Sequence, residues 1–330
     1  RHLTALGHQG IEVIRPNRQL RRLSGKSDPI DAYAAARTAL TESNQPTPKS
    51  GDGAIEQIRY LFTARKSAIK ARTAAQVQIK SLLVTAPTLL RERFRAMADA
   101  ALITSLADFD IRPYPEHQGV VIALRALARR HRYITAEIHS LDQELNTLTE
   151  HTNPALIAAS GVGSVTAAQL LITAGDNPDR LRSEAAFAAL CGVSPIPASS
   201  GKTSRHRLNR GGDRHANSAL HRIALVRMSH DARTKAYVEK KRAEGKGNKE
   251  IIRCLKRAIA REVFTLLTKN VEVPRVDDLR PFRKALGVTL QQAAAHFNVW
   301  ATKISRIERE LTRDDEFTLA YREWLETTAP

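Results

Sequence analysis

The sequence has few cysteines and no long apolar run. Only two of its 330 residues are cysteine, Cys191 and Cys254, and neither lies near a CxxC or Cys/His cluster. This spacing supports neither a zinc site nor a disulfide framework, and it indicates a reducing compartment. No apolar run approaches the roughly 20 residues of a membrane-spanning helix, and no signal peptide is visible, so we expect a cytoplasmic protein without a membrane partner.

Acidic residues are scarce relative to basic ones. The chain has 52 Lys+Arg against 34 Asp+Glu, which gives a formal net charge of +18, and its isoelectric point is near 10.3. Such an excess sets up a positive field that attracts polyanions, so DNA is the expected partner. The alternative is a basic protein that is merely soluble. A chain of this length, with 42% hydrophobic residues, is expected to form two or three domains with buried cores.

The first 45 residues have an α/β pattern. The apolar run Ile11–Ile14 is closed by Pro16, as a strand would be, and a basic loop follows. Asp28 is suited to cap the N-terminus of a helix, with Pro29 at its first position and alanine-rich sequence beyond. A polar linker at 41–53 then separates this segment from the rest of the chain.

Residues 54–150 have a helical pattern. One helix is expected from Ala54 towards Pro87 and a second from near His117. In the second helix a seam of positions recurs in alternating steps of four and three, as in a coiled coil. The seam consists of Val120, Leu124, Leu127, His131, Ile134, Ile138, Leu141, Leu145 and Leu148. The pattern predicts an arm through which the chain forms a homo-oligomer, with His131 setting the register or partly solvated rather than catalytic.

Residues 151–272 contain two features suited to DNA. The first is Gly161-Val162-Gly163, which lies between two short apolar helices and has the form of a helix-hairpin-helix. Gly161 and Gly163 permit a tight turn in which backbone N–H groups face a phosphate. The alternative is a plain helix–helix turn capped by glycine.

The second feature is a loop rich in serine and basic residues. Serine is a weak nucleophile that needs activation, and a positive field favours both a bound phosphodiester and the extra charge of its transition state. Ser199 and Ser200 lie beside Gly201 in this loop. The basic side chains expected to contact DNA here are Lys202, Arg205, Arg207, Arg210 and Arg214. From composition alone, a loop that only grips the DNA backbone is the favoured interpretation.

Three ordered motifs in this region resemble a known family. They are LIAASGVGSVTAAQLL, AAFAALCGVSPIPASSGK and LNRGGDRHANSALHRIAL, all between Leu156 and Leu267. Together they resemble the C-terminal domain of the insertion-sequence 110 family of transposases. The resemblance implies a serine nucleophile at Ser200, with Ser199 the alternative because the two are adjacent. Asn209 stands where the family often has a serine, so Asn209 is not the nucleophile.

A second match lies near the N-terminus. The stretch KSDPIDA at 26–32 resembles the closing motif of the RuvC-like, RNase H-type nuclease domain of the same family. Asp28 and Asp31 share one face of a helix start, where two carboxylates can hold Mg²⁺. The alternative is an N-cap aspartate and a surface one. The family's site uses four acids, and the first two are missing before this motif together with the starting methionine. This chain can therefore be inactive where a longer parent is active.

The same resemblance implies a reaction and its partners. Ser200 would attack a phosphodiester to give a protein–phosphoserine intermediate, which a DNA hydroxyl then resolves. The serine and the acidic site would meet as one composite centre between subunits of an oligomer. A non-coding guide RNA made by the element would pair with donor and target DNA.

The tail at 279–311 resembles the helix-turn-helix of Cro/Xre-type repressors. Thr289 and Gln292 form a capping box, and a turn at Phe297 leads to a second helix. The side chains expected to face major-groove bases are Thr302, Lys303 and Arg306. Those expected to pack inward are Ile304, Ile307 and Leu311. The alternative is a three-helix module that binds protein.

The sequence thus predicts a mixed, mostly α chain in four parts. They are a truncated RuvC-like (RNase H-like) α/β fragment at 1–45, a helical coiled-coil dimerisation arm at 54–150, a helical serine transposase domain with a helix-hairpin-helix at 151–272, and a helix-turn-helix module at 277–330. The expected function is DNA transposition through a serine nucleophile and a Mg²⁺ site. The alternatives are a non-enzymatic DNA-binding regulator and a metal-only resolvase-type nuclease.

Overall fold

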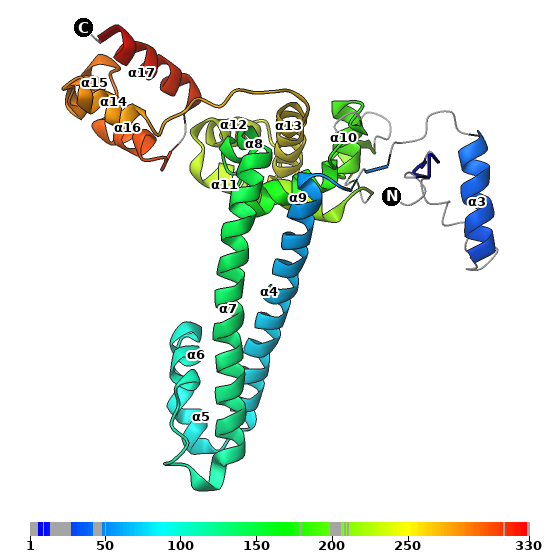
Figure 1. Ribbon diagram of the computed structural model, residues 1–330, viewed down its shortest axis with the longest axis vertical. Helices are drawn as coiled ribbons and strands as arrows, with labels where there is room; N and C mark the ends of the chain where they lie inside the picture. Colours follow the sequence, from blue (N-terminus) through cyan, green and yellow to red (C-terminus); the bar gives the residue numbers. More distant parts are fainter. Residues whose placement is uncertain are drawn as a thin grey trace. The chain divides into compact units, whose positions relative to one another are not determined.

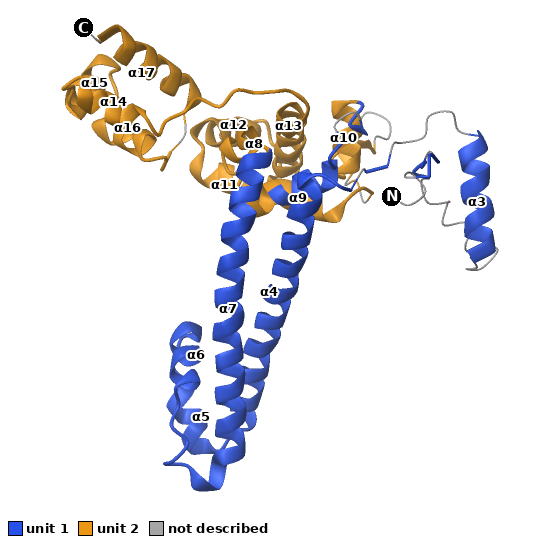
Figure 2. Ribbon diagram, in the orientation of Figure 1, with its two compact units in different colours: residues 1–152, 168–182 blue, residues 153–167, 183–330 orange. Residues whose placement is uncertain are grey.

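A computed structural model of the chain describes residues 6–8, 10–13, 28–41, 48–49, 51–177, 180–198, 206–207, 209, 211–312 and 314–328. The fold is mostly helical, and the only sheet among these residues is a two-stranded ribbon. The chain divides into two compact units, residues 1–152 with 168–182 and residues 153–167 with 183–330 (Figure 2). None of the helices formed by the described residues is long and apolar enough to cross a lipid bilayer.

The first unit is dominated by a long helical hairpin, which we call the arm. Its helices are α4 (Ala54–Thr85), α5 (Thr88–Phe94), α6 (Asp99–Ala107), η1 (Pro115–His117) and α7 (Gln118–Thr152). Figure 1 shows α4 and α7 side by side and running in opposite directions, with α5 and α6 at the far end. All nine predicted seam positions of α7 are buried or half-buried, which confirms the alternating pattern. The seam packs against α4 of the same chain.

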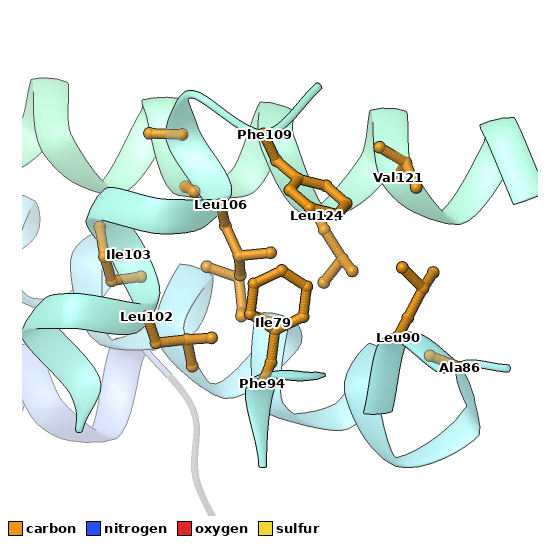
Figure 3. Packing of buried hydrophobic residues seen from close by; sticks show 12 residues of the cluster. Ile79, Ala86, Leu90, Phe94, Leu102, Ile103, Leu106, Phe109, Val121 and Leu124 are labelled. Carbon is orange, nitrogen blue, oxygen red and sulfur yellow. The ribbon is translucent and has the colours of Figure 1, made fainter. Parts of the chain in front are cut away.

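The largest apolar cluster of the arm lies at its tip. Pro87 follows the last turn of α4, and the chain reverses through α5 and α6 before entering α7. The buried residues of this cluster are Ile79, Ala86, Leu90, Phe94, Leu102, Ile103, Leu106, Ala107, Phe109, Val121, Leu124 and Ala128 (Figure 3). The rings of Phe94 and Phe109 meet edge to face, with centroids 5.1 Å apart and an interplanar angle of 76°. This packing joins all four α-helices of the tip.

His131 makes the arm sensitive to pH. Its side chain is half-buried, and burial together with nearby Arg72 lowers the pKa of its imidazole, against a smaller opposing effect of Asp99. A histidine whose pKa falls on folding favours the neutral form in the folded state. Its contribution to stability is therefore complete above the unfolded pKa of about 6.5 and is lost as the pH falls below it.

We expect His131→Leu to raise the free energy of unfolding of the arm by about 1 kcal/mol at neutral pH, because leucine completes the apolar seam. The gain should be larger at a pH of about 5.5, where His131 would otherwise gain a proton. Urea midpoints followed by far-ultraviolet circular dichroism measure both values. His139→Leu, at an exposed position of the same helix, is the control and should show no such pH dependence. A gain from His131→Leu that is equal at both pH values would contradict the prediction.

The N-terminal helix α3 (Asp28–Thr41) agrees with the helix predicted after Pro29. The strand predicted at 11–14 is wrong for residues 11–13, which form no strand, and residue 14 lies outside the described residues. A strand needs a hydrogen-bonding neighbour, and the described residues provide no second strand beside this run.

The second unit begins with a helical bundle. Its helices are α8 (Pro154–Ala158), α10 (Glu184–Leu190), α11 (Arg214–His230), α12 (Ala232–Ala243) and α13 (Asn248–Thr268), while α9 (Ser164–Ala174) is divided between the two units. The side chains of Asn153, Ser183, Asp213 and Asp231 cap α8, α10, α11 and α12 by accepting hydrogen bonds from backbone N–H groups of their first turns. α13 packs against all four of these helices and forms the centre of the bundle.

The C-terminal part of the second unit is a bundle of four short helices, α14 (Leu279–Ala285), α15 (Leu290–His296), α16 (Ala301–Glu308) and α17 (Asp315–Thr328). Both hydrogen bonds of the predicted capping box between Thr289 and Gln292 are present. Asn298 turns the chain between α15 and α16 with a φ of 49°. The buried core consists of Leu279, Ala293, Ala294, Ile304, Tyr321 and Leu325.

Two of the three inward positions predicted on α16 are confirmed. Ile304 and Ile307 are buried, whereas Leu311 is 56% exposed. The prediction for Leu311 is wrong because α16 ends at Glu308 and Glu310 takes a left-handed φ of 58°. The helical periodicity that links Ile304, Ile307 and Leu311 therefore stops before the third position.

Candidate functional site

The loop after α10 packs tightly against the loop before α11. Gly192 has a φ of 64° and Gly212 a φ of 80°, both in the left-handed region. A Cβ on Gly192 would lie 2.4 Å from the carbonyl oxygen of Gly211, and a Cβ on Gly212 would lie 2.6 Å from the nitrogen of Gly192. No side chain fits at either position, which explains the glycines of the second and third sequence motifs.

Asn217, near the start of α11, holds the same junction together. Its Nδ2 donates hydrogen bonds to the carbonyl oxygens of Cys191 and Gly192, at 3.0 and 2.9 Å. Its Oδ1 accepts a hydrogen bond of 2.9 Å from Nζ of Lys256 on α13. One side chain thus joins the loop after α10, the start of α11 and the middle of α13, so the structure brings the second and third motifs together.

Strands β1 (Ile196–Pro197) and β2 (His206–Arg207) form an antiparallel ribbon at this junction, with Ile196 opposite Arg207 and Pro197 opposite His206. The residues between the strands include the predicted nucleophiles. Ser199, Ser200, Lys202, Arg205 and Arg210 all lie outside the described residues. Of the other predicted DNA contacts in this region, Arg207 and Arg214 are both exposed, on β2 and at the first residue of α11.

A pocket of about 560 Å³ is lined by the base of this ribbon, by the loop after α10 and by one stripe of α13. We call it the α13 pocket. Its apolar lining includes Val193, Pro195, Cys254 and Ala258. Its cationic lining consists of Arg207, Lys246, Arg253, Lys256, Arg257 and Arg261. Glu250 is the single carboxylate among the described residues of the lining, so this part of the pocket is strongly positive.

Ion pairs neutralise only part of this charge. The carboxylate of Glu184 on α10 pairs with Arg257 and lies 3.4 Å from Nε of Arg261. Nη2 of Arg253 lies 4.0 Å from Glu250, which is a loose contact. Within the described part of the chain, Arg207 and Lys246 form no ion pair with any side chain. The pocket therefore keeps an excess of positive charge.

Lys256 is the most buried cation of the α13 pocket. Its residue surface is 7% exposed, and burial, reinforced by neighbouring Arg253, lowers the pKa of its ammonium group. The hydrogen-bond partner of its Nζ is the neutral amide oxygen of Asn217. No carboxylate of the described residues lies within 4.0 Å of this ammonium group.

The glycine turn between α8 and α9 is present as predicted, with Gly161 at a φ of 72°. Arg227 on α11 holds this turn: its Nε donates to the carbonyl oxygen of Ser160 at 2.7 Å, and its guanidinium pairs with both carboxylate oxygens of Glu262 at 2.6 and 2.8 Å. The N–H of Gly163 donates to Oγ1 of Thr166 at 3.0 Å. A phosphate would therefore have to displace Thr166 to reach that N–H group.

Asp28 and Asp31 both lie in the first turn of α3, as the sequence predicted, where Asp28 is exposed and Asp31 half-buried. Two carboxylates three residues apart on a helix are neighbours on one face. Among the described residues, no group of three or more His, Cys, Asp or Glu side chains comes together in a form that could hold a metal ion.

The predicted DNA-contacting residues of α16 have different surroundings. Thr302 and Arg306 are exposed, and Nε of Arg306 donates to Oγ1 of Thr312 at 2.9 Å. Lys303 instead contacts α17 and the segment before it. Its Nζ forms an ion pair with Asp314 at 2.9 Å and lies 4.4 Å from the ring centroid of Phe317, as a cation–π contact. Thr302 and Arg306 are thus the two of the three that face solvent most freely.

Sequence reasoning missed the α13 side of the pocket. The predicted site residues include none from α13, although Arg253, Arg257 and Arg261 recur every fourth residue and so share one helix face. That spacing was the available signal. Nothing in the local sequence marks Lys256, because its partner Asn217 lies 39 residues earlier in the chain.

Comparison with known proteins relates this site to mobile elements. Residues 154–239 match the model of a family described as Transposase IS116/IS110/IS902 family. The chain is 31% identical over 150 residues to the Insertion element IS110 uncharacterized 43.6 kDa protein of Streptomyces coelicolor, covering 44% of this chain and 36% of that protein. It is 28% identical over 238 residues to the Transposase for insertion sequence element IS1328 of Yersinia enterocolitica, covering 69% and 66%.

A third relative is the Insertion element IS900 uncharacterized 42 kDa protein of Mycobacterium paratuberculosis, 24% identical over 239 residues, with 69% of this chain and 59% of that protein covered. The chain spans less than two thirds of the length of each of these curated relatives. The segment matched by the family model contains the glycine turn, the ribbon and Asn217, and it ends before α13.

Proposed function

We propose that the chain, whose residues 154–239 match the model of the IS116/IS110/IS902 transposase family, cuts and rejoins DNA as the transposase of an insertion element. The nucleophile we propose is the hydroxyl of Ser200, with Ser199 as the alternative. Its attack would displace a DNA hydroxyl and leave a phosphoserine ester, which a second DNA hydroxyl would then resolve.

The observation that supports this proposal most directly is the α13 pocket at the base of the ribbon. Strand β1 leads into the serine-containing segment and β2 leads out of it, and His206 and Arg207 of β2 line the pocket. A phosphodiester carries a negative charge that grows in the transition state of phosphoryl transfer. Cations at the base of the segment that contains the proposed nucleophile are suited to binding the phosphodiester and to stabilising the added charge of its transition state.

We propose that Asp28 and Asp31 hold Mg²⁺. Two oxygen ligands on one face of the first turn of α3 fit this ion, which takes one or two carboxylates and completes its shell with water and phosphate oxygens. When bound, the ion would neutralise charge on the phosphoryl group. The proposed role of both aspartates is to fix it on the helix.

The proposed partners are DNA, an RNA made by the element as guide, and further copies of this chain. The guide RNA follows from the family resemblance of the sequence motifs. For the C-terminal bundle we propose that Thr302 and Arg306, at the exposed face of α16, contact DNA bases. The exposed ring of Trp300, 85% accessible at the start of the same helix, adds an apolar surface beside them.

Two other functions make different predictions. A metal-only nuclease would cut DNA without any covalent intermediate, and a DNA-binding regulator would bind without cutting. The positive charge of the chain, +18, is compatible with all three. Only the transposase proposal requires a covalent bond between protein and DNA.

The test is therefore a protein–DNA adduct that resists SDS. We would incubate the chain, preceded by an upstream segment that supplies the first two acids of the family's site, with Mg²⁺, DNA carrying the joined ends of the element, and RNA transcribed from its flanks. The protein without substitutions, called the parent below, and its Ser199→Ala variant should form the adduct, and the Ser200→Ala variant should not. An adduct that persists in Ser200→Ala and vanishes in Ser199→Ala would move the nucleophile to Ser199. Cutting without an adduct would favour the nuclease, and binding with neither would favour the regulator.

A further inference from the structure

The buried ammonium of Lys256 forms no ion pair with any carboxylate of the described residues. Taking a charged group out of water is costly unless an opposite charge and hydrogen bonds replace its hydration. Asn217 provides one neutral acceptor to Nζ of Lys256, and an ammonium group has three donors. Neighbouring Arg253 carries the same sign and further disfavours the charged form of Lys256. The site therefore has a cation that no carboxylate in the described part of the chain neutralises.

The surroundings of Lys256 are suited to receiving an anion. Arg253, with a side chain 35% exposed, and Arg207, exposed on β2, line the same pocket. Their guanidinium groups can grip phosphate oxygens by two parallel hydrogen bonds, and a lysine adds a compact point charge. Arg257 and Arg261 are already paired with Glu184, so they are the less available members. An anion in the pocket would meet Lys256 at its most buried point and the arginines at its rim.

The volume and lining favour a phosphodiester of a nucleic acid over a small free ion. About 560 Å³ is far more than an inorganic phosphate fills, and the apolar side chains of Val193, Pro195 and Ala258 offer a surface for a sugar or base. The pocket is lined by His206 and Arg207 of β2, the strand that follows the serine-containing segment in the sequence. Ser200 lies only five residues after Pro195, which lines the pocket, so a DNA strand attacked by this serine would pass close to the pocket.

We propose that the α13 pocket binds one backbone phosphate of the DNA strand on which the serine-containing segment acts, with Lys256 as its buried counter-charge and Arg253 and Arg207 at its rim. This inference rests on the proposed function for the identity of the strand. Asn217 acts as a positioning residue, because its Oδ1 orients the ammonium group and its Nδ2 anchors the loop after α10.

The experiment compares DNA affinity of full-chain variants as a function of salt, using a fluorescein-labelled duplex with a single-stranded end and measuring anisotropy. Lys256→Met keeps the length and volume of the side chain and removes the charge. We expect it to weaken binding about 10- to 100-fold, the usual effect of losing a charge-assisted phosphate contact. The slope of log affinity against log salt should fall by about one. Lys249→Met, an exposed lysine of α13 that does not line the pocket, is the matched control and should change affinity less than about threefold.

A stability measurement separates ligand binding from a structural role. Since Lys256 is a buried and unneutralised cation, Lys256→Met should leave the melting temperature unchanged or raise it. A lower melting temperature with unchanged DNA affinity would overturn the proposal and make Lys256 a structural support for Asn217. Should Lys256→Met fail to fold, Arg253→Gln at the pocket rim should show the same fall in salt slope, and an unchanged slope there would overturn the proposal.

The outcome is distinguishable from a failure of the proposed function. If no variant forms an adduct but Lys256→Met still lowers affinity and slope, the phosphate site stands and the transposase proposal falls. If the parent forms the adduct and Lys256→Met binds DNA as the parent does, the pocket is not a phosphate site and the transposase proposal stands.

Discussion

Replacing Glu308 by alanine is expected to lower the free energy of unfolding of the C-terminal helical bundle by about 3 to 5 kcal/mol. Glu308 on α16 and Arg283 on α14 form a buried pair, with side chains 2% and 7% exposed. Nε of Arg283 lies 2.6 Å from Oε1 of Glu308 and Nη2 lies 2.9 Å from Oε2. Removing the carboxylate would leave a guanidinium charge buried and unpaired, which is the costly outcome.

Further contacts depend on the same carboxylate. The hydroxyl of Tyr321 on α17 donates to Oε1 of Glu308 at 2.8 Å, and burial followed by this hydrogen bond raises the pKa of Tyr321 above its ordinary value. Nη1 of Arg283 also donates to the carbonyl oxygen of Val288 at 2.8 Å. The network therefore joins three helices of the bundle, and its loss should loosen the packing of α16 against α14 and α17.

Urea unfolding followed by tryptophan fluorescence measures this effect in the full chain. The chain has two tryptophans, Trp300 and Trp324, and both lie in the C-terminal bundle, so the signal reports on this part. The ring of Trp324 stacks on His296 with centroids 4.7 Å apart, which makes it sensitive to the packing of α15 against α17.

Two controls sharpen the result. Asp278→Asn breaks a second bidentate pair in the same bundle, between Asp278 and Arg322. The side chain of Asp278 is 46% exposed and that of Arg322 24% exposed. This substitution should therefore lower the free energy of unfolding by less than about 1 kcal/mol. The double variant Arg283→Met, Glu308→Leu replaces the buried pair by apolar groups and should recover most of the stability. If Glu308→Ala costs no more than Asp278→Asn, burial is not what makes this pair important.

The arm illustrates how far periodicity can predict a fold. Alternating steps of three and four place every member of the α7 seam on one helix face, so burial of Leu124, Ile134 and Ile138 follows from sequence spacing alone. The same spacing cannot tell which helix covers the seam, because any apolar stripe of matching length will do. Ala68 of α4 packs on Ile134 and Ile138, and this contact between distant segments is fixed only in three dimensions.

The α13 pocket illustrates the opposite case. The hydrogen bonds of Asn217 to Cys191 and to Lys256 join residues 26 and 39 positions apart, so no local sequence pattern predicts them. Family motifs predicted two of the three segments that meet there, because Gly192 and Gly212 lie inside them. The third segment, α13, has the sequence of an ordinary amphipathic basic helix, and its role emerges from its place at the centre of the bundle.

Gly212→Ala is expected to be the most damaging single-methyl change at this junction. Gly212 has a φ of 80°, which costs an alanine about 1 to 2 kcal/mol, and its Cβ would lie 2.6 Å from the carbonyl oxygen of Leu190 and 2.7 Å from that of Ala189. These are backbone atoms at the end of α10, so the clash cannot be relieved by moving a flexible side chain. Adding about 1 to 3 kcal/mol for overpacking gives a total loss of roughly 2 to 5 kcal/mol.

Gly245→Ala provides the matched control for this prediction. Gly245 has nearly the same left-handed φ, 79°, and a Cβ built on it meets nothing within 4 Å. Its substitution should therefore cost only the backbone term, about 1 to 2 kcal/mol. Urea unfolding followed by far-ultraviolet circular dichroism compares the two variants, and DNA anisotropy should show a loss of affinity in Gly212→Ala alone. Equal effects would mean that backbone conformation, and not the close approach of the loops flanking α10 and α11, dictates glycine at position 212. In that case the two loops could move apart enough to accept a methyl group without distorting the α13 pocket.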